Sequence, residues 1–364
     1  MPATTEGTRK YAARLKEIDA DHFREIDGLL LSSIGLGTYL GDADAETDES
    51  YRQAIIRAVE LGVNVIDTAI NYRFQRSERV IGQAFRDLES AGRAAREELV
   101  VATKAGYLTF DGNPPPDPRQ YFHETLVQTG IVGPRDVVAG SHCMTPRYLE
   151  HQIDQSLRNL GVHTIDIFYV HNPETQLAEI ERDEFYKRLR VAFGFLETAV
   201  KSGKIRRYGL ATWNAFRAAP SARDFISIES AVQCARDVAG AEHNFKVVQL
   251  PYNLAMTEAY TRPNQKVGDH VVTMLEACRQ LGIAVMASAS ILQRRLSRGL
   301  PSSIAGRMPG LHTDAQRAIQ FVRSTPGIAV ALTGMGQVEH VDENLFVARV
   351  PAAPQAVSQI FDAS

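Results

Sequence analysis

The chain has 364 residues, of which 44% are hydrophobic and 23% are charged, and its formal net charge of −3 favours neither a nucleic-acid partner nor an anionic membrane. No apolar run approaches the roughly 18–20 residues of a membrane span, and the N-terminal segment has no apolar signal core. The three cysteines lie far apart and match no disulfide or metal-site pattern, so we expect a cytoplasmic protein that holds no metal.

The first predicted element is a β-hairpin within residues 22–37, which we expect to cap the bottom of the fold. Its turn is expected at Asp27–Gly28, a pair that favours two-residue hairpin turns. Eight short apolar runs then recur along the chain. They are nearly continuous in Val, Ile, Leu and Ala, which is typical of parallel strands buried on both faces. These runs occupy residues 32–38, 63–69, 99–104, 165–170, 205–212, 245–250, 283–289 and 327–333.

Segments with helical spacing lie between the apolar runs. The clearest are residues 49–62, 145–161 and 272–282, and each of them ends in glycine. A strand followed by a helix, repeated eight times, predicts a (β/α)8 barrel, also called a TIM barrel. We expect residues 1–364 to form this one domain, because no composition shift or linker divides the chain.

One spacing between the predicted strands is much longer than the others. It contains an insertion after the third strand, residues 106–144, which is rich in proline and glycine and carries aromatic side chains. Loops at the carboxyl ends of barrel strands set specificity, so we expect this insertion to wall or cover the substrate pocket. The alternative is a solvent-facing decoration or an oligomer contact, and the oligomeric state itself stays open. The residues in question are Tyr107, Phe110, Tyr121, Phe122 and His123.

Four polar residues follow neighbouring predicted strands. Asp67 closes the second strand and Tyr72 lies five residues later, while Lys104 closes the third strand and His171 follows the fourth. Carboxyl ends of adjacent strands meet at one rim of a barrel, so we expect these side chains to converge. A nearby ammonium should lower the pKa of a tyrosine, and a carboxylate can balance a buried lysine. The set predicts a proton-donor site for a carbonyl oxygen.

Each of these residues also has a purely structural interpretation when it is taken alone. An Asp-Thr pair after a strand often caps a helix, a strand-end lysine is usually solvated, and a histidine can simply bond to the backbone. Their occurrence together at adjacent strand ends favours the catalytic interpretation. The remaining histidines at 123, 142 and 163 lack ligand-like spacing, so we interpret them as structural or surface residues.

A series of short motifs resembles the aldo-keto reductase superfamily, in the family's order. The resemblance covers roughly residues 30–350 and is interrupted mainly by the insertion. It implies that Tyr72 is the general acid, that Lys104 and Asp67 tune it, and that His171 orients the substrate carbonyl. The motifs are GLGT (35–38), DTAxNY (67–72), SERVIGQA (77–84), TK (103–104), SLRNLG (156–161), DxFYVHNP (166–173), GKIRRYG (203–209), QLPYN (249–253) and EN (343–344).

The same resemblance implies a nicotinamide nucleotide bound across the barrel mouth, without a Rossmann domain. We expect NADP(H) over NAD(H), and this expectation rests on the general preference of the family. Three arginines after the seventh strand, at 294, 295 and 307, are candidates for the pyrophosphate, although a basic surface loop is the alternative. The expected cofactor residues are Gly37, Thr38, Thr212, Gln249, Ser288, Gly334, Gln337, His340, Glu343 and Asn344.

The chain departs from the family at several of these positions. Ala211 and Thr212 replace a Ser-Asn pair that holds the nicotinamide amide, and Ser288 replaces an aromatic residue that stacks on the nicotinamide. Gly334 and His340 stand where NADP-selective members often carry Lys and Arg. The proton donor is therefore better supported by the sequence than the cofactor site.

The leading prediction is a nicotinamide-dependent oxidoreductase that interconverts a carbonyl (aldehyde, ketone or sugar) and an alcohol. Asn172 and Trp213 are the expected substrate contacts, although Trp213 could equally serve the core. Two alternatives stay open. One is a non-redox lyase, epimerase or dehydratase that uses the same four residues, and the other is a nucleotide-sensing binding subunit.

Overall fold

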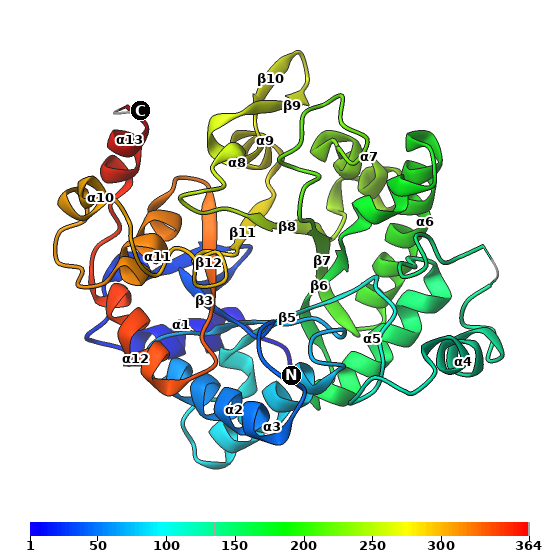
Figure 1. Cartoon of the computed structure of the whole chain (residues 1–364), viewed down its shortest axis with the longest axis horizontal. Coiled ribbons are helices and arrows are strands. Elements are labelled where there is room, and N and C mark those ends of the chain that lie inside the picture. Colours follow the sequence, from blue (N-terminus) through cyan, green and yellow to red (C-terminus); the bar gives the residue numbers. More distant parts are fainter. Residues whose placement is uncertain (134, 363–364) are drawn as a thin grey trace.

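The computed structural model describes residues 1–133 and 135–362. Eight parallel strands close into a barrel in the order β11-β12-β3-β4-β5-β6-β7-β8, and helices surround it (Figure 1). All eight apolar runs predicted as strands form this barrel, so the predicted (β/α)8 fold is confirmed. The barrel strands are β3 (Ile34–Gly37), β4 (Val65–Asp67), β5 (Val100–Ala105), β6 (Ile165–His171), β7 (Ile205–Ala211), β8 (Phe245–Pro251), β11 (Ala284–Ser288) and β12 (Ile328–Gly334).

The helices around the barrel bury one apolar face each. In α5, Pro146 occupies the first turn, where its missing N–H costs nothing, and the buried residues recur with helical spacing from Tyr148 to Leu160. The larger helices are α2 (Ala45–Glu60), α3 (Arg76–Ser90), α5 (Pro146–Leu160), α6 (Arg182–Lys201), α7 (Ile228–Ala239), α9 (Met274–Leu281), α11 (Asp314–Ser324) and α12 (Val338–Leu345). Further helices are α1 (Thr5–Arg14), α4 (Pro118–Phe122), α8 (Glu258–Thr261), α10 (Ser302–Arg307) and α13 (Pro354–Asp362), and the short helices are η1 (Ala20–His22), η2 (Arg96–Glu98), η3 (His123–Val127), η4 (Pro173–Ala178), η5 (Gly240–Glu242) and η6 (Phe346–Arg349).

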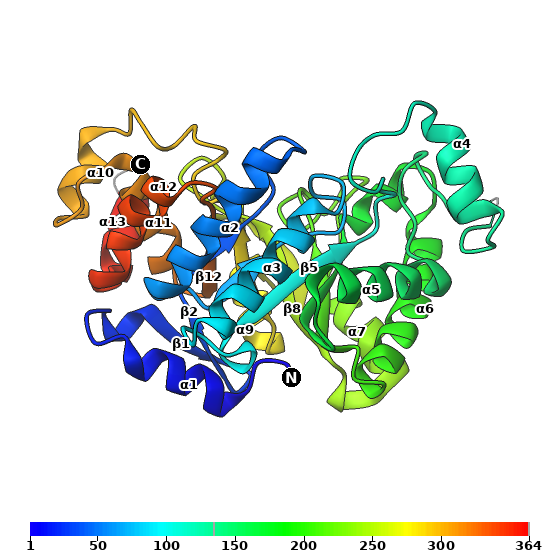
Figure 2. The same ribbon diagram turned by 90° about the horizontal axis from the view of Figure 1, so that it is seen from below.

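The predicted N-terminal hairpin is present. Strands β1 (Phe23–Ile26) and β2 (Leu29–Ser32) pair in antiparallel fashion, and both turn residues, Asp27 and Gly28, have positive φ angles of 48° and 77°. Leu29 and Leu31 are buried in the cluster that fills the barrel interior. The hairpin therefore closes the end of the barrel opposite the loops that follow the strands (Figure 2). A second hairpin, which the sequence analysis did not predict, consists of β9 (Pro263–Val267) and β10 (His270–Thr273).

The insertion at residues 106–144 begins and ends beside the barrel and projects away from it. Its two ends form a stem, in which the Cys143 N–H donates to the Gly106 carbonyl at 2.8 Å and Tyr107 forms a β-bridge with His142. Its outer part carries α4, which lies at the periphery of the molecule in both views (Figures 1 and 2). A small core of its own, which includes Leu126 and Tyr148, anchors this part to α5.

Among residues 1–133 and 135–362, no helix has the length and apolar character that crossing a bilayer requires. Within the same residues, no cluster of three or more His, Cys, Asp and Glu side chains is arranged to hold a metal ion.

Candidate active site

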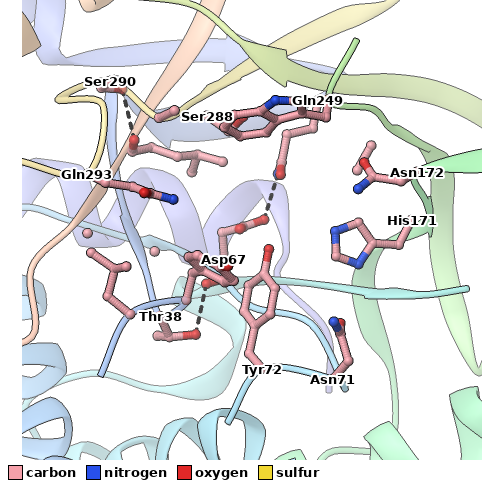
Figure 3. Close-up of a pocket in the computed structure, with 18 of the residues that line it drawn as sticks. Thr38, Asp67, Asn71, Tyr72, His171, Asn172, Gln249, Ser288, Ser290 and Gln293 are labelled. Atoms are coloured by element: carbon pink, nitrogen blue, oxygen red, sulfur yellow. Dashed lines mark hydrogen bonds between the residues drawn. The ribbon is translucent and has the colours of Figure 1, made fainter. Parts of the chain in front are cut away.

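The four residues singled out from the sequence meet at the open end of the barrel, where Figure 3 shows Asp67, Tyr72 and His171. They come from three neighbouring strands: Asp67 ends β4, Lys104 lies near the end of β5 and His171 ends β6. Tyr72 reaches the same place from the loop after β4. The Lys104 Nζ atom lies 5.0 Å from the centre of the Tyr72 ring, and the Tyr72 and His171 rings are 5.9 Å apart between centroids.

A buried ion pair forms the floor of this site. The Lys104 ammonium donates to Asp67 Oδ2 at 2.7 Å and to the carbonyl of Thr68 at 2.7 Å. The Gln249 side-chain amide donates to the other oxygen of Asp67, also at 2.7 Å, as the dashed line in Figure 3 marks. Burial lowers the pKa of Lys104, and the Asp67 carboxylate opposes this effect. Asp67 therefore has a donor at each oxygen, an arrangement that keeps both charges in place.

Tyr72 differs from the sequence expectation in its electrostatics. We expected the Lys104 ammonium to lower the pKa of the phenol, but the pKa of Tyr72 is raised well above its ordinary value of 10.0. Burial is the main cause, and the negative charge of Asp67 adds to it. Because Asp67 balances Lys104, the pair offers the phenolate little net attraction. Tyr72 is therefore a neutral hydroxyl, which is the form that can donate a proton.

His171 is held as a neutral imidazole. Burial lowers its pKa well below 6.5, and the positive charge of Lys104 lowers it further. Its Nδ1 atom is buried and has no hydrogen-bond partner within the described part of the chain. The Tyr107 ring, which comes from the insertion, packs edge-on against His171 at 5.3 Å between centroids.

A cavity of about 470 Å³ opens above these side chains. It is lined by Asp67, Tyr72 and His171, by the expected substrate residues Asn172 and Trp213, and by most of the expected cofactor residues. The latter are Gly37, Thr38, Thr212, Gln249, Ser288 and Gly334. Sequence reasoning missed several residues that also line it, namely Tyr39, Leu40, Asn71, Ala289, Ser290, Ile291, Gln293 and Leu332.

The chain matches one family of known proteins over most of its length. The model of the aldo/keto reductase family matches residues 33–299. The chain belongs to the aldo/keto reductase family. Its membership makes it an oxidoreductase of carbonyl and alcohol groups that uses a nicotinamide nucleotide, and the resemblance inferred from the short motifs is confirmed.

Individual relatives are distant. An uncharacterized oxidoreductase of Schizosaccharomyces pombe is 23% identical over 345 residues, which cover 92% of this chain and 88% of that protein. An NADH-specific methylglyoxal reductase of Escherichia coli is 29% identical over 51% of this chain and 50% of its own length. Among solved structures, an aldo/keto reductase from Klebsiella pneumoniae in complex with NADP and acetate has a TM-score of 0.60 at 22% identity, with 93% of each chain covered. These structural likenesses support the fold.

The residues around the cavity fit the amide of a nicotinamide. Thr212 Oγ1 is buried, belongs to a residue that lines the cavity, and has no hydrogen-bond partner within the described residues. Gln249 lies beside it, because the Thr212 N–H donates to the Gln249 carbonyl at 2.9 Å. A free hydroxyl can both donate to and accept from a primary amide. Ser288 lines the cavity as expected and offers no aromatic face, whereas Tyr39 and Trp213 present rings at the rim.

Four of the expected cofactor residues lie outside the cavity lining. All are in or beside α12: Gln337 precedes its first turn, and the others are His340, Glu343 and Asn344. The Glu343 carboxylate accepts a hydrogen bond from the Thr313 hydroxyl at 2.9 Å, so it links α12 to α11. Of the three candidate arginines, Arg294 lines the cavity, whereas Arg295 and Arg307 do not.

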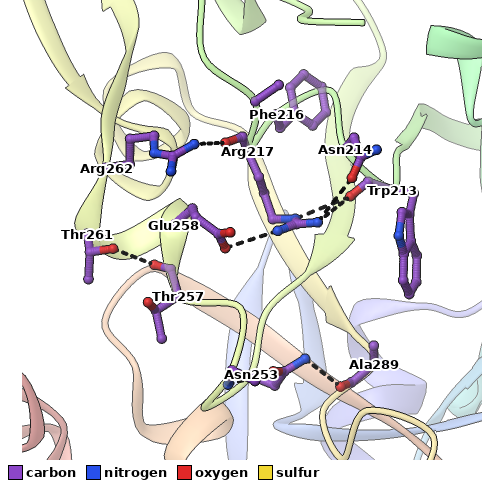
Figure 4. Close-up of polar contacts among 12 residues, drawn as sticks. Trp213, Asn214, Phe216, Arg217, Asn253, Thr257, Glu258, Thr261, Arg262 and Ala289 are labelled. Atoms are coloured by element: carbon purple, nitrogen blue, oxygen red, sulfur yellow. Dashed lines mark hydrogen bonds and ion pairs between the residues drawn. The ribbon is translucent and has the colours of Figure 1, made fainter. Parts of the chain in front are cut away.

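The loop after β7 carries Trp213 and is fixed from two sides, of which Figure 4 shows the side formed by Arg217. The Arg217 guanidinium donates twice to the Trp213 carbonyl at 3.2 Å and pairs with Glu258 at 3.0 Å. On the other side, Glu174 Oε1 accepts from the N–H groups of Trp213 at 2.7 Å and of Asn214 at 3.2 Å. Burial raises the pKa of Glu174 to about 7. A buried carboxyl therefore holds the loop that presents Trp213.

Two turns at the rim have a rare backbone conformation. Residues 73–75, directly after Tyr72, and residues 292–294, after β11, are runs of three non-glycine residues with φ angles between 44° and 73°. Left-handed backbone costs about 1–2 kcal/mol per residue for side chains other than glycine. In the first turn, Arg73 forms an ion pair with Asp48, and the Gln75 amide donates to the Phe110 carbonyl at 3.0 Å. Backbone conformations of this kind persist where surrounding contacts hold them in place, and they are common at functional sites.

The insertion contributes one side chain to the cavity and builds a second hollow beside it. Tyr107 lines the main cavity, whereas Phe110 stacks on Phe122 at 4.9 Å between centroids and also contacts Tyr121. His123 begins η3, away from the cavity. The second hollow has a volume of about 250 Å³ and meets the main cavity at a shared residue, Asn71. Its other lining residues are Phe74, Leu108, Thr109, Phe110, Phe122, Gly140 and Ser141.

Proposed function

We propose that this protein reduces a carbonyl compound with Tyr72 as the general acid, and runs the reverse oxidation with the Tyr72 phenolate as the base. The observation that carries this proposal is the placement of a neutral phenol between the Lys104 ammonium and the neutral His171 imidazole, at the floor of the cavity. A role in binding alone would not need a buried Lys104–Asp67 pair under a phenol.

The chemistry assigned to the chain is a proton transfer. The substrate oxygen lies within reach of the Tyr72 hydroxyl and the His171 ring, and both orient it. As negative charge develops on that oxygen, the proton moves from Tyr72 Oη to it, and the Lys104 ammonium lies 5.0 Å from the ring of the phenolate that is left. Asp67 keeps Lys104 protonated despite its burial. A nicotinamide nucleotide, when bound, would supply the hydride, which carries the two electrons and the hydrogen that are added to the carbonyl carbon.

We assign Thr212 and Gln249 to the nicotinamide amide and Arg294 to a phosphate of the nucleotide. The unpartnered Thr212 hydroxyl supports the first assignment, and the position of Arg294 at the cavity rim supports the second. NADP(H) is the proposed cofactor. A relative in Schizosaccharomyces pombe is named as an NADP(+) enzyme, whereas the methylglyoxal reductase of Escherichia coli is named as NADH-specific, so the choice needs a direct test.

We further propose that the insertion contacts the substrate. The hollow that contains the rings of Phe74, Phe110 and Phe122 adjoins the catalytic cavity at Asn71, so an apolar or aromatic group on the carbonyl compound can extend into it. This assignment favours carbonyl substrates with a large apolar group over small polar ones.

The decisive experiment titrates the purified protein with NADPH and with NADH and follows the cofactor fluorescence. We expect micromolar binding of at least one nucleotide, tighter for NADPH, followed by turnover on a panel of aldehydes and ketones. If neither nucleotide binds, the reductase proposal fails, and a non-redox acid/base enzyme becomes the better explanation. If a nucleotide binds tightly but no carbonyl is turned over, a nucleotide-sensing role replaces it.

A further inference from the structure

The stem of the insertion lies directly against the backbone of His171. The His142 Nε2 atom is 2.7 Å from the His171 carbonyl oxygen, and both residues are buried. The approach is so close that a Cβ atom on Gly106 would lie 2.6 Å from the same carbonyl oxygen and 2.7 Å from His142 Nε2. Glycine at position 106 is therefore required for the stem to reach the end of β6.

A chain of hydrogen bonds fixes the direction of this contact. Arg188, on α6, has only donors, and its Nη1 atom lies 3.0 Å from Gln176 Oε1. The Gln176 oxygen must therefore face Arg188, which turns its NH₂ group toward His142 Nδ1 at 2.9 Å. His142 Nδ1 then accepts, so the ring proton is on Nε2 and is donated to the His171 carbonyl. The donor and the acceptor are therefore assigned at each of the three hydrogen bonds that join Arg188, Gln176, His142 and His171.

The ring of His142 can fill this role because it is neutral. Burial lowers the pKa of His142 to about 4, so Nδ1 is free to accept at physiological pH. The same stem also holds the side chains around His171. Tyr107 packs on the rings of both histidines, and its hydroxyl lies 3.2 Å from the Asn172 Nδ2 donor and 3.1 Å from the Thr175 hydroxyl.

We propose that His142, supplied by the insertion and oriented by Gln176 and Arg188, is a positioning residue that sets the place of the His171 imidazole in the site. The inference rests on the proposed role of His171 in carbonyl reduction. The insertion then has two roles: it borders the proposed substrate hollow, and it holds the His171 ring that orients the substrate carbonyl. The carbonyl held by His142 belongs to His171 itself, so a shift of this backbone moves the ring directly.

The test compares two substitutions at His142 with one at a control position. His142→Leu removes the donor and the acceptor, whereas His142→Gln retains an amide donor that can reach the His171 carbonyl. His123→Leu, in the same insertion but away from the cavity, is the matched control. We expect His142→Leu to lower kcat by about tenfold or more with little change in nucleotide affinity, because small displacements of a catalytic group are costly. His142→Gln should recover most of the loss, and His123→Leu should behave as wild type.

A second measurement does not depend on turnover. Ring ¹H–¹⁵N correlation spectra of the histidines report the environment of His171 in the full-length protein, whether or not a carbonyl substrate is found. We expect the His171 ring signals to move in His142→Leu and to return toward wild type in His142→Gln. Unchanged His171 signals in His142→Leu would overturn the proposal, whatever the kinetics. If His142→Leu does not fold, Arg188→Met is used in its place. Arg188 is the partly exposed end of the hydrogen-bonded series, and its loss leaves the Gln176 amide free to turn. Unchanged His171 signals in this variant would likewise overturn the proposal.

Discussion

The Lys104 ammonium lies 2.7 Å from the Asp67 carboxylate in a buried site. Two opposite charges in such a place are stable only as a pair, because removing one leaves the other without compensation. The pair also explains why the Tyr72 phenol stays protonated, since its two charges nearly cancel at the ring.

Replacing Tyr72 by phenylalanine should remove the proton donor and leave the cavity shape intact. We expect kcat for carbonyl reduction to fall by about 10²–10⁴-fold, the usual contribution of a general acid. Nucleotide affinity, measured by fluorescence titration, should not change. An unaltered kcat would reject the role assigned to Tyr72, and Tyr121→Phe on the insertion is a matched control.

The buried pair should be more sensitive to the loss of one partner than to the loss of both. Lys104→Met leaves Asp67 without its counter-charge, and we expect the free energy of unfolding to fall by about 3–5 kcal/mol. The double variant with Asp67→Asn should be less destabilised than Lys104→Met alone. Urea unfolding of wild type, Lys104→Met, Asp67→Asn and the double variant gives the coupling energy between the two residues. Purely additive changes in the free energy of unfolding would contradict the pairing.

Glu174 should make the stability of the protein depend on pH. The folded state keeps the carboxyl protonated up to about pH 7, whereas the unfolded chain releases the proton near its ordinary value of 4.5. The stability from this group is therefore present at low pH and is lost as the pH rises from 4.5 through 7, by about 3 kcal/mol.

The substitution Glu174→Gln isolates this effect, because the amide oxygen can still accept from Trp213 and Asn214. Urea unfolding between pH 4.5 and 7.5 should show that the variant gains stability relative to wild type as the pH rises. Buried histidines such as His142 act in the opposite direction in both proteins, and the comparison cancels their contribution. A constant difference across this pH range would show that Glu174 does not titrate as described.

Filling the hollow beside the insertion should change substrate choice. Thr109→Phe places a ring among Phe74, Phe110 and Phe122, and we expect kcat/KM for aromatic ketones to fall by about tenfold or more relative to small aldehydes. Val127→Phe, at an exposed position of the same insertion, is the control. If both variants keep the wild-type ratio, the insertion is a decoration or an oligomer contact.

Arg294 should contribute to nucleotide binding through its charge. Arg294→Ala is expected to weaken NADPH binding by about tenfold, which corresponds to the loss of one charge-assisted hydrogen bond, and the loss should shrink at high salt. Arg298→Ala, in the same loop but outside the cavity lining, should bind as wild type. Equal effects of the two substitutions would indicate general electrostatic attraction in place of a specific contact.

The sequence was sufficient for features that depend on local patterns. Continuous apolar runs predicted all eight barrel strands, and the Asp27–Gly28 pair predicted the N-terminal hairpin, because each signal is confined to a few neighbouring residues. The convergence of Asp67, Lys104 and His171 followed from the barrel itself, since adjacent parallel strands bring their carboxyl ends to one rim.

Features that depend on contacts between distant segments were beyond the sequence. His142 was interpreted as structural or surface because it lacks ligand-like spacing, and its contact with His171, 29 residues away in the chain, appears only in the folded structure. The pKa of Tyr72 was predicted in the wrong direction because burial and the balance of Lys104 by Asp67 are properties of the packed site. The turn at residues 292–294 carries no glycine, so nothing in its composition indicated a left-handed backbone.

These left-handed turns have a consequence for anyone who tries to evolve this protein toward heat resistance. At residues 292–294, whose side chains are exposed or half-buried, glycine would relieve backbone energy of about 1–2 kcal/mol per position, so a screen for stabilising substitutions should be enriched there. The same changes would delete side chains such as Gln293 and Arg294 from the edge of the cavity. Thermal stability and nucleotide binding therefore place opposite demands on the same few residues. A variant selected for thermal stability without an activity assay is expected to lose nucleotide affinity first.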